Sequence, residues 1–190
     1  MHKSPLQAAT LEKIANTLLF LGEKIKPLKM TAALKFVYLL DEESIKRYGI
    51  PFFGLDYRVW QYGPVSAELY SELNKPTRLA NQLEVRKTEN GSEVLFKKST
   101  FDDSEFSDNE IDLLKEIRDS YWTMFGFEMV SMTHEENGLW YKTASRHHLL
   151  DKNGKMTKPT SQHELDFAEL LRNDPQKLNR FLSYKEFKAI

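Results

Sequence analysis

The sequence has no cysteine in its 190 residues, and this absence limits the chemistry open to it. Disulfide bonds and thiolate metal sites are excluded, which fits a protein of the reducing cytoplasm. No apolar run approaches the roughly 20 residues of a membrane span, and the first residues lack the apolar core of a signal peptide. We therefore expect a cytoplasmic protein without a membrane partner.

The common catalytic and cofactor motifs are also missing. There is neither a Gly-x-Ser-x-Gly elbow nor a glycine-rich phosphate loop. His134-Glu135-Glu136 begins like a zinc protease motif, but Gly138 stands where the second histidine is needed. A hydrolase using His134 with Glu135 or Glu136 is the weakest hypothesis. We predict no enzyme, no cofactor and no metal, and expect His134 to hold its loop against Trp140.

Net charge is −1, so the chain is not a globally basic nucleic-acid binder, and a nucleic-acid partner is not expected. Charge is nevertheless uneven. Acidic residues dominate the segment 102–119, whereas basic residues outnumber acidic ones after Lys142. The acidic segment is interpreted as a solvated loop and helix face, with a docking surface for a basic partner as the alternative.

The richest apolar stretch, 28–73, predicts the core of the fold. Between Ala32 and Leu40 only Lys35 is charged, which indicates a helix buried on nearly every face. Its continuation Asp41-Glu42-Glu43 is expected in solvent, and Gly49 is expected to end it. Alternation over 53–62 predicts a half-buried strand, with Tyr57 and Val59 inside and Trp60 on the opposite face. Pro64 is expected to open the next helix.

Flanking segments predict further helices and a hairpin. Ser4 to Gln7 and Ser107 with Glu110 are capping boxes that begin two helices, the second expected to end near Gly126. Runs on either side of Asn90-Gly91 predict a hairpin over 83–96, which we expect to extend the 53–62 strand into one sheet. A short helix over 127–133 leads to the His134 loop. Later helices are expected from Ser161 and from Asp174-Pro175.

Together these elements predict an α+β fold. Helices pack around a small antiparallel sheet made of one strand plus a hairpin. The texture of the sequence changes near Ala144. We therefore assign residues 1–144 to a globular domain and residues 145–190 to a helical C-terminal extension.

The segment 48–73 resembles the Panacea domain, the SocA-like antitoxin family of bacterial and phage toxin–antitoxin systems. Its most recognisable part is the strand aromatic followed by Gly63-Pro64-Val65 and Tyr70. A second, partial match is Thr133-His134 with Trp140, where Leu139 stands in place of the proline that such domains often show. The resemblance covers roughly Leu11 to Ala144.

This resemblance implies an antitoxin that neutralises a toxin encoded by an adjacent gene through direct binding. A cognate protein toxin is the implied partner, with a protease or a chaperone as a further candidate. The alternative function is a DNA-binding regulator of winged-helix type, although only one expected helix separates the first strand from the hairpin. Motif residues carried over as partner-binding candidates are Tyr57, Trp60, Tyr62, Gly63, Pro64, Val65, Tyr70, His134 and Trp140. Among them, we expect Trp60 and the start of the Pro64 helix to face the toxin.

Overall fold

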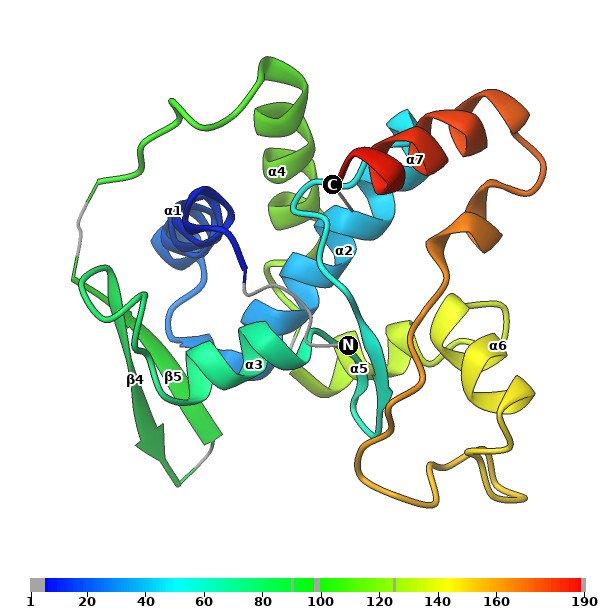
Figure 1. Cartoon of the computed structure of the whole chain (residues 1–190). Coiled ribbons are helices and arrows are strands. Elements are labelled where there is room, and N and C mark those ends of the chain that lie inside the picture. Colours follow the sequence, from blue (N-terminus) through cyan, green and yellow to red (C-terminus); the bar gives the residue numbers. More distant parts are fainter. Residues whose placement is uncertain (1–5, 90, 98–99, 125, 189–190) are drawn as a thin grey trace.

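Helix α2 (Met30–Tyr48) runs through the middle of the fold, with the other elements packed around it (Figure 1). The computed structural model describes residues 6–89, 91–97, 100–124 and 126–188. The predicted apolar run explains this position, because every residue from Ala32 to Asp41 is buried. The helix ends as predicted at Gly49, whose φ of 70° lets its N–H bond the carbonyl of Ile45.

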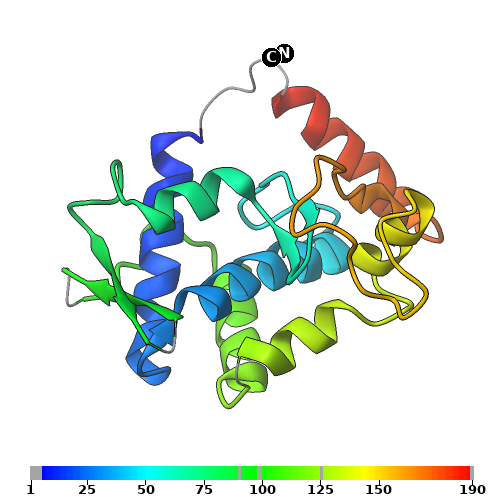
Figure 2. The ribbon, with the colours of Figure 1, turned by 90° about the horizontal axis from the view of Figure 1, so that it is seen from below.

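Further helices surround α2 and make the fold mainly helical, as predicted. On one side of α2 lie α1 and the strands β4 and β5, and on the other lie α6 and α7 (Figure 2). The helices are α1 (Ala8–Lys24), α3 (Ala67–Asn74), α4 (Asp108–Tyr121), α5 (Gly126–Thr133), α6 (Leu139–Arg146), the 3-10 helix η1 (Phe167–Leu171) and α7 (Pro175–Lys188).

Helix boundaries test the predicted caps. The Ser107–Glu110 capping box is confirmed at the start of α4, and the Ser4 box lies outside the described residues. The predicted helix end at Gly126 is wrong, because α4 already stops at Tyr121 and Gly126 begins α5. The helix expected from Ser161 is instead the short η1, which begins after Asp166, whose side chain accepts from the N–H of Ala168.

The predicted hairpin is confirmed, but its partner is not the expected strand. Strands β4 (Leu83–Thr88) and β5 (Gly91–Phe96) pair antiparallel. The other edge of β5 pairs with β1 (Leu28–Lys29), placing Leu28 opposite Val94. The single sheet predicted from the 53–62 strand and the hairpin is therefore wrong. The two-residue β1, between α1 and α2, occupies the edge of β5 that β2 was expected to pair with. The hairpin therefore lies on the side of α2 away from β2.

Of the strand predicted over 53–62, only residues 58–60 form a strand, and they belong to a separate two-stranded ribbon. Strand β2 (Arg58–Trp60) pairs with β3 (Gly63–Val65), and Val59 lies opposite Pro64. Pro64 thus belongs to a strand and not to a helix start, and α3 begins only at Ala67. A proline is tolerated there because β3 is an edge strand, on which a missing N–H breaks no ladder bond.

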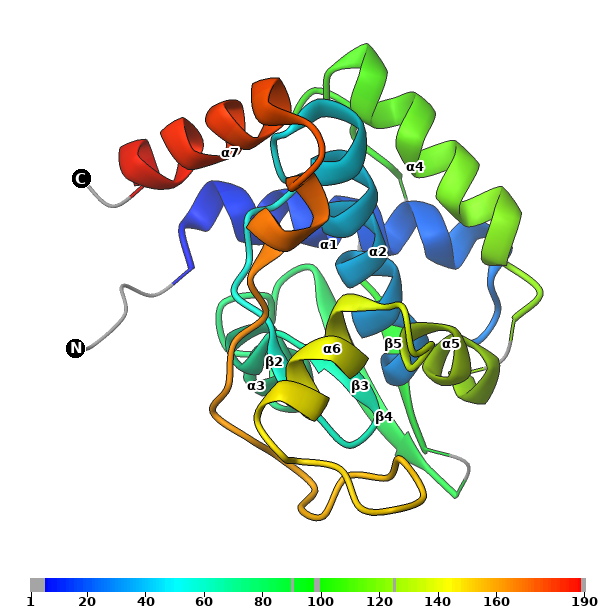
Figure 3. The ribbon, with the colours of Figure 1, turned by 90° about the vertical axis from the view of Figure 1, so that its right-hand side faces the viewer.

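The C-terminal segment covers the other edge of β2 (Figure 3). Val59 N–H donates to the carbonyl of His163 (3.0 Å), Gln61 N–H to that of Pro159 (2.9 Å), and Leu165 N–H to that of Tyr57 (2.9 Å). Its apolar residues also join the main core; they are Leu165, Phe167, Leu171 and Phe181. Residues 159–188 therefore pack directly on the elements that carry the family motif.

Candidate functional site

A buried lysine lies at the centre of the candidate site. Lys35 is 1% exposed, and its Nζ donates to the carbonyl of Pro64 at 3.1 Å. Burial lowers the pKa of this amine from 10.5 to about 7, because the charged form loses its hydration. Lys35, the one charged residue in the apolar run of α2, thus hydrogen-bonds the backbone of the Gly-Pro motif.

Gly63 brings the β2–β3 turn against this lysine. Its φ is 96°, and a Cβ added there would lie 2.6 Å from Lys35 Nζ and 2.5 Å from Thr133 Oγ1. Only glycine fits both the left-handed backbone and this space. Thr133, the last residue of α5, is buried and donates its hydroxyl to the carbonyl of Val130 at 2.9 Å.

His134 and Trp140 close the cluster from the side of α5 and α6. Their rings meet edge to face at 3.8 Å between centroids, which confirms the predicted contact. Burial and the nearby Lys35 lower the pKa of His134 to about 4, so it is neutral at physiological pH. Trp140 Nε1 donates to the carbonyl of Trp60 at 3.0 Å and so ties α6 to β2.

The two motifs found in the sequence therefore meet in space around Lys35, which we name the Lys35 cluster: Lys35, Gly63, Pro64, Thr133, His134 and Trp140. Many of the predicted partner-binding residues are used up in the core: Tyr57, Gly63, Pro64, Val65 and Trp140 are buried. Trp60, Tyr70 and His134 are half-buried, and Tyr62 is 65% exposed. As predicted, Trp60 lies on the face opposite Val59, where its ring packs on Tyr70 at 5.1 Å.

The prediction that Asp41 lies in solvent is wrong. It is fully buried and accepts hydrogen bonds from the N–H groups of Phe53 (2.6 Å), Gly54 (3.0 Å) and Leu55 (3.2 Å) and from the Tyr57 hydroxyl (2.8 Å). Burial raises the pKa of Asp41 against the opposing effect of these four donors, and it raises the pKa of Tyr57 well above its ordinary value.

This carboxylate organises the whole loop after α2. The N–H groups of 53–55 bond Asp41 and not a neighbouring strand, which is why β2 starts only at Arg58. A signal was present in the sequence, because Asp41 continues the helical spacing of the buried Leu34, Val37 and Tyr38.

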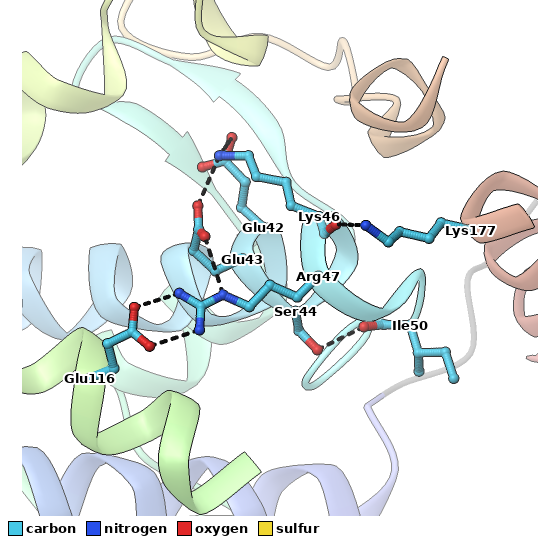
Figure 4. Close-up of polar contacts among 8 residues, drawn as sticks. All are labelled: Glu42, Glu43, Ser44, Lys46, Arg47, Ile50, Glu116 and Lys177. Carbon is cyan, nitrogen blue, oxygen red and sulfur yellow. Dashed lines mark hydrogen bonds and ion pairs between the residues drawn. The ribbon is translucent and has the colours of Figure 1, made fainter. Parts of the chain in front are cut away.

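The end of α2 is held to its neighbours by charged side chains (Figure 4). Arg47 forms a two-pronged pair with Glu116 of α4, at 2.7 and 2.5 Å, and Lys46 bonds Glu43 at 2.9 Å. Lys177 of α7 donates to the carbonyl of Lys46 at 3.0 Å. Glu42 is only half-buried, and burial raises its pKa.

Part of the acidic segment 102–119 is likewise neutralised by ion pairs with basic residues of the same chain. Glu116 pairs with Arg47, Asp119 with Lys24 at 2.9 Å, and Glu110 with Lys13. These contacts hold α4 against α1 and α2. They also reduce the negative charge available to an outside partner.

The contacts of the Lys35 cluster are those of a structural site that holds neighbouring elements together. Its polar groups bond backbone carbonyls or lie against rings and glycine, and the part of the chain that the structure describes holds no group of three or more His, Cys, Asp or Glu side chains arranged for a metal. What the cluster does is fix β2 and β3 against α2, α5 and α6.

Comparison with known protein families adds the decisive observation. The family model described as antitoxin SocA-like, Panacea domain, matches residues 34–141, which is more than half of the chain. This chain belongs to the SocA-like Panacea antitoxin family. The Panacea domain begins inside α2 and ends inside α6, so it contains the whole Lys35 cluster. No curated protein and no solved structure matches the chain.

Members of an antitoxin family have a toxin as partner in general terms. In the ranges that the structure covers, no helix is both long and apolar enough to cross a bilayer. The Panacea domain leaves η1 and α7 outside its match, although both pack on α2.

Proposed function

We propose that this protein is a cytoplasmic antitoxin of a bacterial or phage-associated toxin–antitoxin pair. It neutralises a toxin encoded by an adjacent gene by binding that toxin directly, and it does so without catalysis. The observation that supports this proposal is the family match over residues 34–141. A protease or a chaperone that receives the bound toxin is a further candidate partner.

The burial of the motif residues limits how they could contribute to binding. A stable protein interface covers about 1,600 Å² and depends on a few accessible anchors, among which aromatic residues are common. Of the motif aromatics, Tyr62 at the β2–β3 turn is 65% exposed, while Trp60 and Tyr70 keep part of their surface. We therefore propose Tyr62, together with the exposed parts of Trp60 and Tyr70, as a toxin-facing surface. The buried motif residues would act indirectly by holding the turn in place.

The assay is rescue of growth when the adjacent gene is expressed with variants of this chain. Tyr62→Ala is expected to fold normally and to rescue less well than the wild type. Phe127→Ala is the control, because Phe127 is 71% exposed on α5, outside the motif residues. Full rescue by Tyr62→Ala, with the adjacent gene proven toxic, would remove this surface from the proposal and leave the antitoxin role standing.

The DNA-binding alternative has no comparable support. Net charge is −1, and two of the cations around the hairpin are already engaged. Lys29 and Arg86 each bond Glu93 at 2.8 Å. A DNA-reading hairpin needs such cations for phosphates.

Residues 145–190 are proposed to be an extension of the Panacea domain that depends on it for folding. Their backbone bonds to β2 and their place in the common core support this. The boundary proposed near Ala144 then separates the region that carries the family motifs from a segment that covers it.

A further inference from the structure

An open groove of about 550 Å³ lies between α6 and η1, which are neighbours in Figure 3. Leu139 and Lys142 line it from α6, and Leu170 and Arg172 line it from η1 and the residue after it. One wall thus comes from α6, inside which the family match ends, and the other from the C-terminal extension. We call it the α6–η1 groove.

Positive charge exceeds negative charge in the α6–η1 groove. Its lining holds the cations Lys142, Arg146 and Arg172 and the carboxylates Glu136 and Glu169. Glu169 is 10% exposed and is bound by both terminal nitrogens of Arg146, at 2.5 and 2.8 Å. Bonding to Arg146, helped by Arg172 and Lys142, lowers the pKa of Glu169. Glu169 therefore interacts with all three cations, and Glu136 is the second carboxylate of the lining.

Two of these cations keep unused bonding capacity. Arg172 is 69% exposed and approaches Glu169 only to 3.5 Å, so most of its N–H donors face the groove or solvent. Lys142 is exposed and has no carboxylate within ion-pair distance among the described residues. A second carboxylate placed between them would gain charge-assisted hydrogen bonds from both sides.

We propose that the α6–η1 groove binds an acidic segment of the toxin, with its carboxylates on Lys142 and Arg172 and its apolar atoms against Leu170. This inference rests on the proposed antitoxin function. Arg146 and Glu169 form the floor that holds the two walls together. Because Lys142, Leu170 and Arg172 all lie beyond the family match, which ends at residue 141, residues outside the match contribute to the choice of toxin.

The test uses the full chain and a double charge reversal, Lys142→Glu with Arg172→Glu. The control is Lys75→Glu with Lys87→Glu, an equal change in net charge at exposed sites outside the groove. Both variants are first checked for an unchanged unfolding midpoint. Binding is then measured for two probes, the purified product of the adjacent gene and a fluorescent oligoglutamate peptide, at low and high salt.

The groove variant is expected to bind both probes at least about tenfold more weakly than the wild type, because two attractive contacts become repulsive. Most of the salt dependence of binding should be lost as well. The control is expected to change each by less than about twofold. Equal binding of the toxin by the groove variant and wild type overturns the proposal while the antitoxin function stands. Peptide binding without any toxin complex overturns the toxin as the partner.

A third probe separates acidic protein from nucleic acid. Single-stranded DNA carries negative charge too, and its binding depends on cations in the same way. We expect the wild-type chain to bind the oligoglutamate peptide and to show no DNA affinity that the groove variant removes. DNA binding that depends on Lys142 and Arg172 and exceeds peptide binding would overturn the proposal.

If the groove variant unfolds, Lys142→Gln with Arg172→Gln replaces it, because neutral side chains remove the attraction without adding repulsion around Glu169. The same loss of toxin and peptide binding is then expected, to a smaller degree. Binding equal to that of the wild type in this neutral variant overturns the proposal, as it would in the charge-reversal variant.

Discussion

Replacing Lys35 by methionine should remove a pH dependence of folding stability. In the folded protein burial holds the pKa of Lys35 at about 7, while the ordinary value is 10.5. Between these values the unfolded chain binds more protons than the folded one. Stability should therefore rise as pH increases from about 7 towards 10.

The size of this rise follows from the two pKa values. Each pH unit is worth 1.36 kcal/mol at full difference, so the gap between about 7 and 10.5 corresponds to roughly 5 kcal/mol. Over the accessible range from pH 7 to 9.5 the expected gain is about 3 kcal/mol. His134, with a pKa of about 4, acts below this range. Tyr38 and Tyr57 act above it, since burial raises both pKa values well above 10.0.

The assay is urea unfolding of wild type, Lys35→Met and a control at several pH values in this range. The control is Lys87→Met, since Lys87 is exposed on β4. The control should keep the wild-type slope, and Lys35→Met should flatten it while also losing the bond to the Pro64 carbonyl. A wild-type stability that falls or stays level from pH 7 to 9.5, or an unchanged slope in Lys35→Met, would refute the reasoning.

Two further variants test the scaffold of the motif by unfolding free energy. Asp41→Ala leaves three buried N–H donors without an acceptor and the Tyr57 hydroxyl with the Val37 carbonyl alone, so we expect a loss of about 3 kcal/mol or more. Asp112→Ala on the exposed face of α4 should change stability by less than about 0.5 kcal/mol; a small effect of Asp41→Ala would show that the loop finds other acceptors. Gly63→Ala and Gly91→Ala both place alanine at positive φ, but only Gly63 has atoms within 3 Å of the added Cβ. Gly63→Ala should therefore cost at least about 2 kcal/mol more, and equal losses would contradict the close packing on Lys35.

Much of the fold could be predicted because its signals are local. The capping box at Ser107, the left-handed stop at Gly49 and the hairpin over 83–96 each depend on residues a few positions apart. The apolar run of α2 likewise predicts a buried helix, whatever it packs against. These are interactions within one element, so the sequence pattern contains them.

The errors concern partners that are distant in the sequence. Asp41 looks like a solvated helix end until the N–H groups of 53–55 are placed around it. The hairpin shows no preference in its sequence between pairing with β1 and pairing with β2. Pro64 suits both a helix start and an edge strand, and only its pairing with Val59 decides.

The sequence predicted residues of the candidate site but not how they contact one another. Both motifs were found, but not that Lys35 lies between them, because the charge in an apolar run gives no information about which backbone it meets. Exposure was equally hidden. Tyr57 and Tyr62 look alike in the motif, yet one is 1% and the other 65% exposed.

The central claim is direct binding of a toxin, and one measurement tests it most directly. The adjacent gene is expressed alone and together with this chain, growth is scored, and the two products are purified through a tag on one of them. The account predicts growth arrest by the adjacent product alone, recovery on co-expression and a stable complex of the two proteins. Recovery without a complex, or arrest that this chain does not relieve, would contradict it.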